Sequence, residues 1–201
     1  MLILLILLQN CSKKEQLPYY PFADLTPYWT SDGTIDPDTV SSIRDFRLLN
    51  QDSIVISSSR TKGKVYVANF FFTICPGICP KLTSNLKLVA EAKSDLDDFR
   101  IISHSVTPEL DSVPSLKEYE KEYELAGYNW DLVTGDRDEI YDLAFNSYFT
   151  EQEVNTNPTE NTFLHTEKVI LVDREGKIRG IYNGTLELDM KRLIEDIDLI
   201  Y

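Results

Sequence analysis

The chain has few of the residues that carry metal and redox chemistry: its 201 residues include three cysteines, two histidines and two methionines. Three cysteines allow one internal disulfide bond at most, which excludes a small scaffold held together by several disulfides. Basic residues are also scarce, with 20 Lys and Arg against 33 Asp and Glu, and the formal net charge is −13. Because this charge repels phosphates, it argues against a nucleic-acid partner.

Long hydrophobic runs are missing as well. The apolar segment Met1–Leu8 is shorter than the about 20 residues that a membrane-spanning helix needs, and it resembles the hydrophobic part of a secretory signal. It leads to Cys11 through Gln9 and Asn10, a junction that resembles a bacterial lipoprotein processing site. The resemblance implies a signal segment over residues 1–11, a lipid anchor on Cys11, and a folded part outside the cytoplasm on the periplasmic side. The alternative is a buried N-terminal strand with a free thiol.

The remaining sequence predicts an irregular lead-in followed by one alternating α/β domain. Residues 12–39 are rich in Pro, Lys and Tyr and predict a tether with an extended approach to a domain over residues 40–201. We predict strands and hairpins from the apolar runs and turn residues, at 46–56, 64–72, 99–106, 130–133, 168–173 and 178–182. Helical periodicity predicts helices over 82–90, 114–125, 140–148 and 186–200, the second of them charged and solvated, while 151–162 is polar and irregular.

Strands that alternate with helices and end in an antiparallel hairpin predict a three-layer α/β/α sandwich. Two cysteines stand where the strand predicted at 64–72 meets the next helix, which matches a thioredoxin-like architecture. The fold class is therefore α/β: a thioredoxin-like three-layer sandwich with an N-terminal β-hairpin extension and a terminal antiparallel hairpin.

Cys75 and Cys79 lie four residues apart directly after this apolar strand. We expect Cys75 at the N-terminus of the helix and Cys79 one turn further on the same face. Unpaired N–H groups and the helix dipole favour the thiolate there. Two neighbouring thiolates can close a redox-active disulfide or hold a soft metal ion.

Residues 63–83, with the element Cys75-Pro-Gly-Ile-Cys79-Pro, closely resemble the signature of the Sco/SenC family. Its members are membrane-tethered, thioredoxin-fold copper proteins that help to assemble the CuA centre of cytochrome c oxidase. The resemblance continues through residues 105–112, 130–136 and 163–176, although Thr107 stands where the family usually has Asp. It covers the chain from residue 40 to residue 200.

The resemblance implies that Cys75, Cys79 and His165 bind copper, as Cu(I) or Cu(II). Thiolates suit Cu(I) and imidazole suits both oxidation states, so the ligand set is chemically coherent. It further implies a monomeric metallochaperone, anchored to the membrane by its lipid. The implied partner is the oxidase subunit that carries the CuA site, or another copper or thiol protein. The chain would deliver copper to that partner or maintain its thiols.

The residues by themselves leave other functions open. The cysteine pair could be a structural disulfide, or the active pair of a thiol–disulfide oxidoreductase that needs no metal, with Cys75 as the attacking thiol. The spacing is one residue longer than in the usual CxxC motif, and His165 stands near the position where thioredoxin-like reductases carry a proline, which favours metal. A copper- or redox-sensing protein would use the same residues, and His165 alone could be an ordinary surface histidine.

Three further residues have simpler interpretations. His104 lies within an apolar strand and is expected to be a hydrogen-bonded strand residue. Asp111 could support the site, contact a partner, or begin the following helix. Met190, on the last predicted helix, is expected to pack in the core rather than to bind metal.

Overall fold

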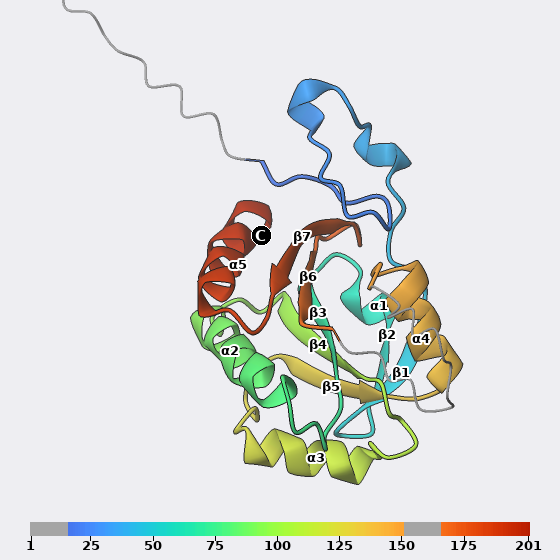
Figure 1. The fold of residues 1–201 in the computed structure, drawn as a ribbon, viewed down its shortest axis with the longest axis vertical. Coiled ribbons are helices and arrows are strands. Elements are labelled where there is room, and N and C mark those ends of the chain that lie inside the picture. The colour runs from blue at the N-terminus through green and yellow to red at the C-terminus, as the bar shows by residue number, and fades with distance from the viewer. Residues whose placement is uncertain (1–15, 151–165) are drawn as a thin grey trace, which may run out of the picture.

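A single mixed sheet organises the chain (Figure 1), which we describe from a computed structural model that covers residues 16–150 and 166–201. Within these residues seven strands pair in the order β2-β1-β5-β4-β3-β6-β7. Their bounds are β1 Arg47–Asn50, β2 Val55–Ser57, β3 Val65–Phe71, β4 Phe99–Ser105, β5 Trp130–Thr134, β6 Lys168–Val172 and β7 Ile178–Asn183. Cys11, His165 and the polar segment 151–162 lie outside the described residues.

The central strand β3 has the environment that its apolar sequence predicts. All seven of its residues are buried, as expected for a strand covered on both faces. It pairs in parallel with β4 and antiparallel with β6. β4 also pairs in parallel with β5, so β3, β4 and β5 end at the same edge of the sheet.

Helices cover both faces of this sheet: α1 Ser58–Thr61, α2 Cys79–Ala92, α3 Val113–Glu122, α4 Arg137–Asn146 and α5 Glu187–Ile200. α2 and α5 lie side by side, with α1 and α4 on the other side of the molecule (Figure 1). Ser112 and Asp136 are the N-caps of α3 and α4: each side chain accepts a backbone N–H, which fixes the residue at which its helix begins. The predicted layers are therefore confirmed; the short α1 is an addition that the sequence did not predict.

Both predicted hairpins form. β1 and β2 pair antiparallel around the turn at 51–54, and β6 and β7 pair around the turn at 173–177. In the second turn Gly176 adopts a φ of 80°, a left-handed conformation that favours glycine, and its N–H donates to Asp173 O at 2.9 Å.

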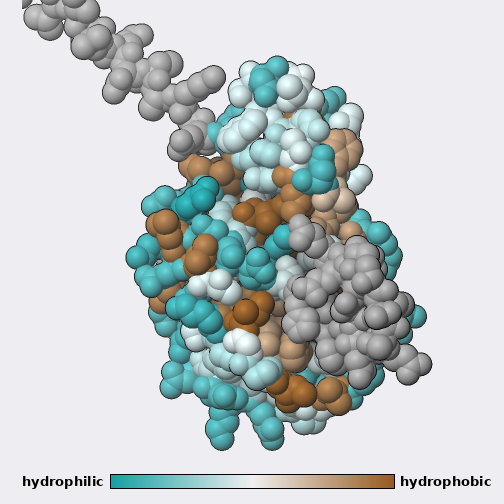
Figure 2. Space-filling model, viewed as in Figure 1, coloured by the Kyte–Doolittle hydropathy of each residue, from teal (hydrophilic) through white to brown (hydrophobic). Residues whose placement is uncertain are grey.

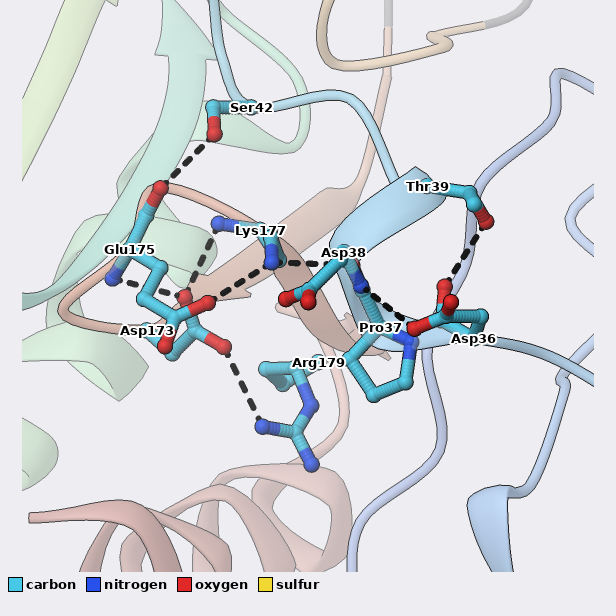
Figure 3. A network of polar contacts seen from close by, with 9 residues as sticks. All are labelled: Asp36, Pro37, Asp38, Thr39, Ser42, Asp173, Glu175, Lys177 and Arg179. Atoms are coloured by element: carbon cyan, nitrogen blue, oxygen red, sulfur yellow. Dashed lines mark hydrogen bonds and ion pairs between the residues drawn. The ribbon is translucent and has the colours of Figure 1, made fainter.

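The lead-in packs on this second turn through a network of polar contacts (Figure 3). Arg179 Nη2 donates to Leu17 O at 2.7 Å, and the Arg179 guanidinium stacks 3.9 Å from the Tyr19 ring centroid. Lys177 Nζ donates to Pro37 O at 2.9 Å. Because Val172 and Ile178 pair beside the beginning of β3, these contacts lie at the opposite end of β3 from the cysteines that follow it.

The face of the molecule drawn in Figure 2 carries much hydrophilic surface. Figure 2 shows that apolar patches on the face in view are small and separated by hydrophilic surface. Scattered patches of this kind are normal for a globular protein and do not by themselves mark an interface.

His104 is a buried strand residue, as predicted. Its ring is fully buried and stacks on Phe70, with 5.0 Å between ring centroids, and Nδ1 lies 3.3 Å from Asn69 O. Burial lowers the pKa of His104 from 6.5 to about 4, although the hydrogen bonds to the Asn69 and Ile102 backbone oppose the shift. The imidazole is therefore neutral in the folded chain at neutral pH.

This histidine predicts a pH dependence of stability. Between pH 6.5 and 4 the unfolded chain binds a proton at His104 that the folded chain does not, so stability falls as the pH falls. From pH 6.5, where the unfolded side chain is already half-protonated, to pH 5 the loss should be about 1.6 kcal/mol, less than the full 1.36 kcal/mol per pH unit. Urea unfolding of the wild type and His104→Phe at both pH values should show a shallower pH dependence in the variant. Equal dependence in the two proteins would contradict the assignment.

Candidate metal centre

The two cysteines occupy the turn that connects β3 to α2. The expectation that Cys75 lies at the helix N-terminus is wrong by one turn, since α2 begins at Cys79. Pro76 and Gly77, two residue types that favour turns, stand between Cys75 and the first helical residue. Pro80, by contrast, lies in the first turn of the helix, where its missing N–H costs nothing.

Both thiols are free and buried, and their side chains are hydrogen-bonded to each other. Burial opposes ionisation of Cys75, but the hydrogen bonds from the Cys79 thiol and from the backbone N–H groups of Cys79, Gly77 and Ile78 outweigh it. The pKa of Cys75 is therefore lowered. The backbone N–H groups expected to stabilise a thiolate are present, although Cys75 itself precedes the helix.

Cys79 has the opposite character. Burial, the hydrogen bond to Cys75 and the charge of Cys75 raise the pKa of Cys79 to about 12, against a smaller lowering by the backbone of Phe72. The first proton to leave the pair therefore comes from Cys75. Cys75 is therefore the more acidic thiol of the pair, with Cys79 as its protonated neighbour.

Helix α3 closes one side of this pair. Tyr119 is buried, its hydroxyl lies 2.7 Å from Thr83 Oγ1 on α2, and its ring packs on Phe71 at the end of β3. Burial raises the pKa of Tyr119, and the charge of Cys79 contributes to the shift. The expectation that this charged helix is simply solvated is therefore wrong for its inner face. Tyr119 and Tyr123 are four residues apart and so lie on one face of the helix, and this spacing could have predicted a buried face.

Asp111 lies behind the turn over residues 72–78 that connects β3 to α2 and contains Cys75, called the cysteine turn below. Its fully buried carboxylate accepts hydrogen bonds from Thr73 Oγ1 and Ser105 Oγ, each at 2.6 Å. The helix that follows is capped by Ser112 instead, so Asp111 does not begin it. Of the three interpretations the sequence left open, the contacts favour support of the site.

The third predicted ligand, His165, lies outside the described residues. Over 16–150 and 166–201, no group of three or more His, Cys, Asp or Glu side chains is arranged to hold a metal ion. His104 is on the other face of the sheet, against Phe70 and Tyr148, and Met190 is fully buried in the core as predicted. The described part of the site therefore consists of two sulfur donors, a set that suits a soft cation.

Comparison with known proteins identifies relatives along nearly the whole described chain. The SCO1/SenC family model matches residues 36–200. A SCO1/SenC family lipoprotein from Bacillus anthracis str. Ames is similar in structure, with a TM-score of 0.70 and 28% identity over 79% of this chain and 94% of that one.

Two further solved structures are similar at this level. BsSco, a member of the Sco family of cytochrome c oxidase assembly proteins in which a disulfide switch was identified, has a TM-score of 0.67. It is 33% identical over 78% of this chain and 91% of its own. ScoI of Bradyrhizobium japonicum, solved with copper bound, has a TM-score of 0.65 and 25% identity over 80% of this chain and 100% of its own.

In the part of the chain that the structure describes, no helix has both the length and the apolar character to cross a membrane. The family match spans the cysteine turn, the sheet around it and the terminal hairpin. On this evidence the chain belongs to the SCO1/SenC family.

Proposed function

We propose that this chain is an extracytoplasmic copper-binding protein that delivers copper to, or maintains the thiols of, the CuA site of cytochrome c oxidase during assembly. Cys75, Cys79 and His165 would be its ligands, and it would act as a monomer. The observation that carries the proposal is the preformed pair of reduced thiols in the turn between β3 and α2. Copper in a solved ScoI and the oxidase-assembly role of the Sco family support it.

The geometry of the two thiols suits capture of a soft cation. Cys75 offers a sulfur whose negative charge is already stabilised by three backbone N–H groups. Cys79 loses its proton less readily, so binding must displace that proton. Copper, when bound, supplies the positive charge that favours the second thiolate, and affinity should therefore decrease as the pH falls.

The register of β6 supports His165 as the third ligand. Val169 pairs with Asn69, so the chain before Val169 continues toward the end of β3, where the cysteine turn begins. Glu167 O accepts the Gly184 N–H at 2.7 Å, and Gly184 packs against Leu82, one turn beyond Cys79. The described chain therefore resumes close to the cysteine turn, and this supports the proposal for the third ligand.

Cys11 is the proposed site of lipid attachment, with residues 1–11 as signal segment, 12–39 as tether and lead-in, and 40–201 as the copper-binding domain. The apolar run before Cys11 and the lipoprotein character of the Bacillus anthracis relative support this organisation. It would hold the domain at the periplasmic side of a membrane.

A second function, thiol–disulfide exchange with a partner, is favoured by the difference between the two thiols. A stabilised Cys75 thiolate could attack a partner disulfide, and Cys79 would then resolve the mixed disulfide. The partner gains two electrons, and Cys75 and Cys79 lose two electrons and two protons as their sulfurs join. The disulfide switch identified in BsSco supports redox chemistry at this pair.

Copper titration of the reduced chain lacking residues 1–11 tests the first proposal. We expect one tightly bound copper per chain. Cu(II) binding is measured by the Cu(II)–thiolate absorption, and Cu(I) binding by competition against a chelator. His165→Ala should weaken binding by more than about tenfold, or 1.4 kcal/mol, because a ligand is lost. His104→Phe, which changes the other histidine, is the matched control and should bind like the wild type. No specific copper binding by the reduced wild type would refute the carrier function.

Alkylation of single-cysteine proteins tests the assigned difference between the thiols. At pH 7 we expect Cys79→Ser, which retains Cys75, to react with iodoacetamide at least about tenfold faster than Cys75→Ser, because only a thiolate is nucleophilic. Urea-unfolded samples, in which both thiols are exposed, should react at similar rates. Faster reaction of folded Cys75→Ser would reverse the assignment.

Fractionation of a bacterial host that processes lipoproteins tests Cys11. The full chain should be recovered with membranes and carry a lipid on Cys11, detected by mass spectrometry of the N-terminal peptide. Cys11→Ala should lose the lipid because the acceptor sulfur is absent. A wild-type chain without lipid would leave residues 1–11 without the proposed role.

A further inference from the structure

Asp111 is an unusually placed acidic residue. Its side chain is fully buried, and none of the ion pairs formed among the described residues involves it. Taking a carboxylate out of water is costly unless hydrogen bonds compensate for the lost hydration. Three hydroxyls and one backbone N–H donate to it: Thr73 Oγ1 at 2.6 Å, Ser105 Oγ at 2.6 Å, Thr107 Oγ1 at 3.0 Å, and Thr73 N at 3.2 Å.

These donors come from two separate parts of the chain. Thr73 belongs to the cysteine turn, two residues before Cys75, whereas Ser105 and Thr107 lie at and after the end of β4. Asp111 is itself fixed by its own N–H, which donates to Thr107 O at 2.9 Å. One carboxylate thus joins the start of the cysteine turn to the rigid edge of the sheet.

The turn has few other supports on this side. Cys75 N donates to Phe72 O at 3.3 Å, and the neighbouring Ile74 side chain is 68% exposed. The N–H groups that donate to Cys75 Sγ belong to residues 77–79, at the end of this turn and the start of α2. Their orientation relative to the sulfur therefore depends on where the turn begins. A displacement of Thr73 would change the position of Cys75 relative to those donors.

We propose that Asp111 is a positioning residue of the cysteine site: it holds Thr73 against β4 and so sets the geometry with which Cys75 and Cys79 present their sulfurs. The proposal rests on the copper and thiol function proposed above. A carboxylate group suits this task because its two oxygens can receive all four donors together. An amide of the same shape replaces one of these oxygens by an NH₂ group, which donates, so the groups on that side lose their acceptor.

The test compares Asp111→Asn with a matched control, Asp131→Asn. Asp131 is also a buried carboxylate of this sheet, but it accepts from Asn50 Nδ2 at 2.8 Å and pairs with Arg100, away from the cysteine turn. Both changes should lower stability in urea unfolding. Asp111→Asn should also weaken copper binding by about 10–100-fold, the usual effect of losing an outer-sphere partner, and shift the Cu(II)–thiolate absorption band. Asp131→Asn should leave affinity and band unchanged.

Thr73 supplies a second pair of variants that keeps the test decisive if Asp111→Asn does not fold. Thr73→Val removes the hydroxyl donor at nearly constant volume and should reproduce the copper defect, whereas Thr73→Ser keeps the hydroxyl and should bind like the wild type. Wild-type affinity and absorption in folded Asp111→Asn or in Thr73→Val would overturn the proposal. An equal effect of Asp131→Asn would overturn it too, since general loss of stability would then explain the change.

A second readout separates this proposal from the function on which it rests. In the Cys79→Ser background, Asp111→Asn should change the rate at which Cys75 is alkylated, because the N–H groups around its sulfur are displaced. If the wild type binds no copper but this rate changes, the copper function fails and the positioning role stands. If copper binds normally and neither the rate nor the absorption changes, the positioning role fails alone.

Discussion

The burial of β3 on both faces is the constraint on which the rest of the structure depends. A strand in this position must have partners on both edges and helices above and below, and β4, β6 and the flanking helices meet these needs. Because β3 and β4 are parallel, they end at the same edge of the sheet. The turn after β3 and the loop after β4 are therefore neighbours, which is why Thr73 and Asp111 can meet although 38 residues separate them.

The two thiols of the site have different pKa values because their surroundings differ. Cys75 lies in the irregular turn, where free N–H groups point at its sulfur, and Cys79 lies at the first helical position, packed near Tyr119. The same difference would serve both the metal capture and the thiol exchange proposed for this pair. Copper binding and disulfide formation there would exclude each other, because both would use the same two sulfurs, so the redox state of the pair would control its capacity for metal.

The sequence predicted the structural features that depend on residues close together in the chain. The apolar run of β3, the two hairpins and the periodic helices are features of consecutive residues, and all were found. Two expectations failed where a local rule or a distant contact prevailed. The turn that contains Pro76 and Gly77 separates Cys75 from the start of α2. The inner face of α3 is buried, and Glu120 on it accepts a hydrogen bond from Gln51, 69 residues away. The convergence of hydroxyls on Asp111 is likewise a product of strand order, which no short segment encodes.

The contacts of the lead-in and the cysteine turn lie at opposite ends of β3. Arg179 and Lys177 fasten the N-terminal side of the chain near the beginning of β3, while the cysteine turn follows its other end. The tether proposed for this part of the chain would therefore hold one end of the sheet and leave the opposite end facing outward. Under the proposed function, a partner that exchanges metal or electrons with Cys75 would approach along the long axis of β3, away from the attachment that keeps the domain in place.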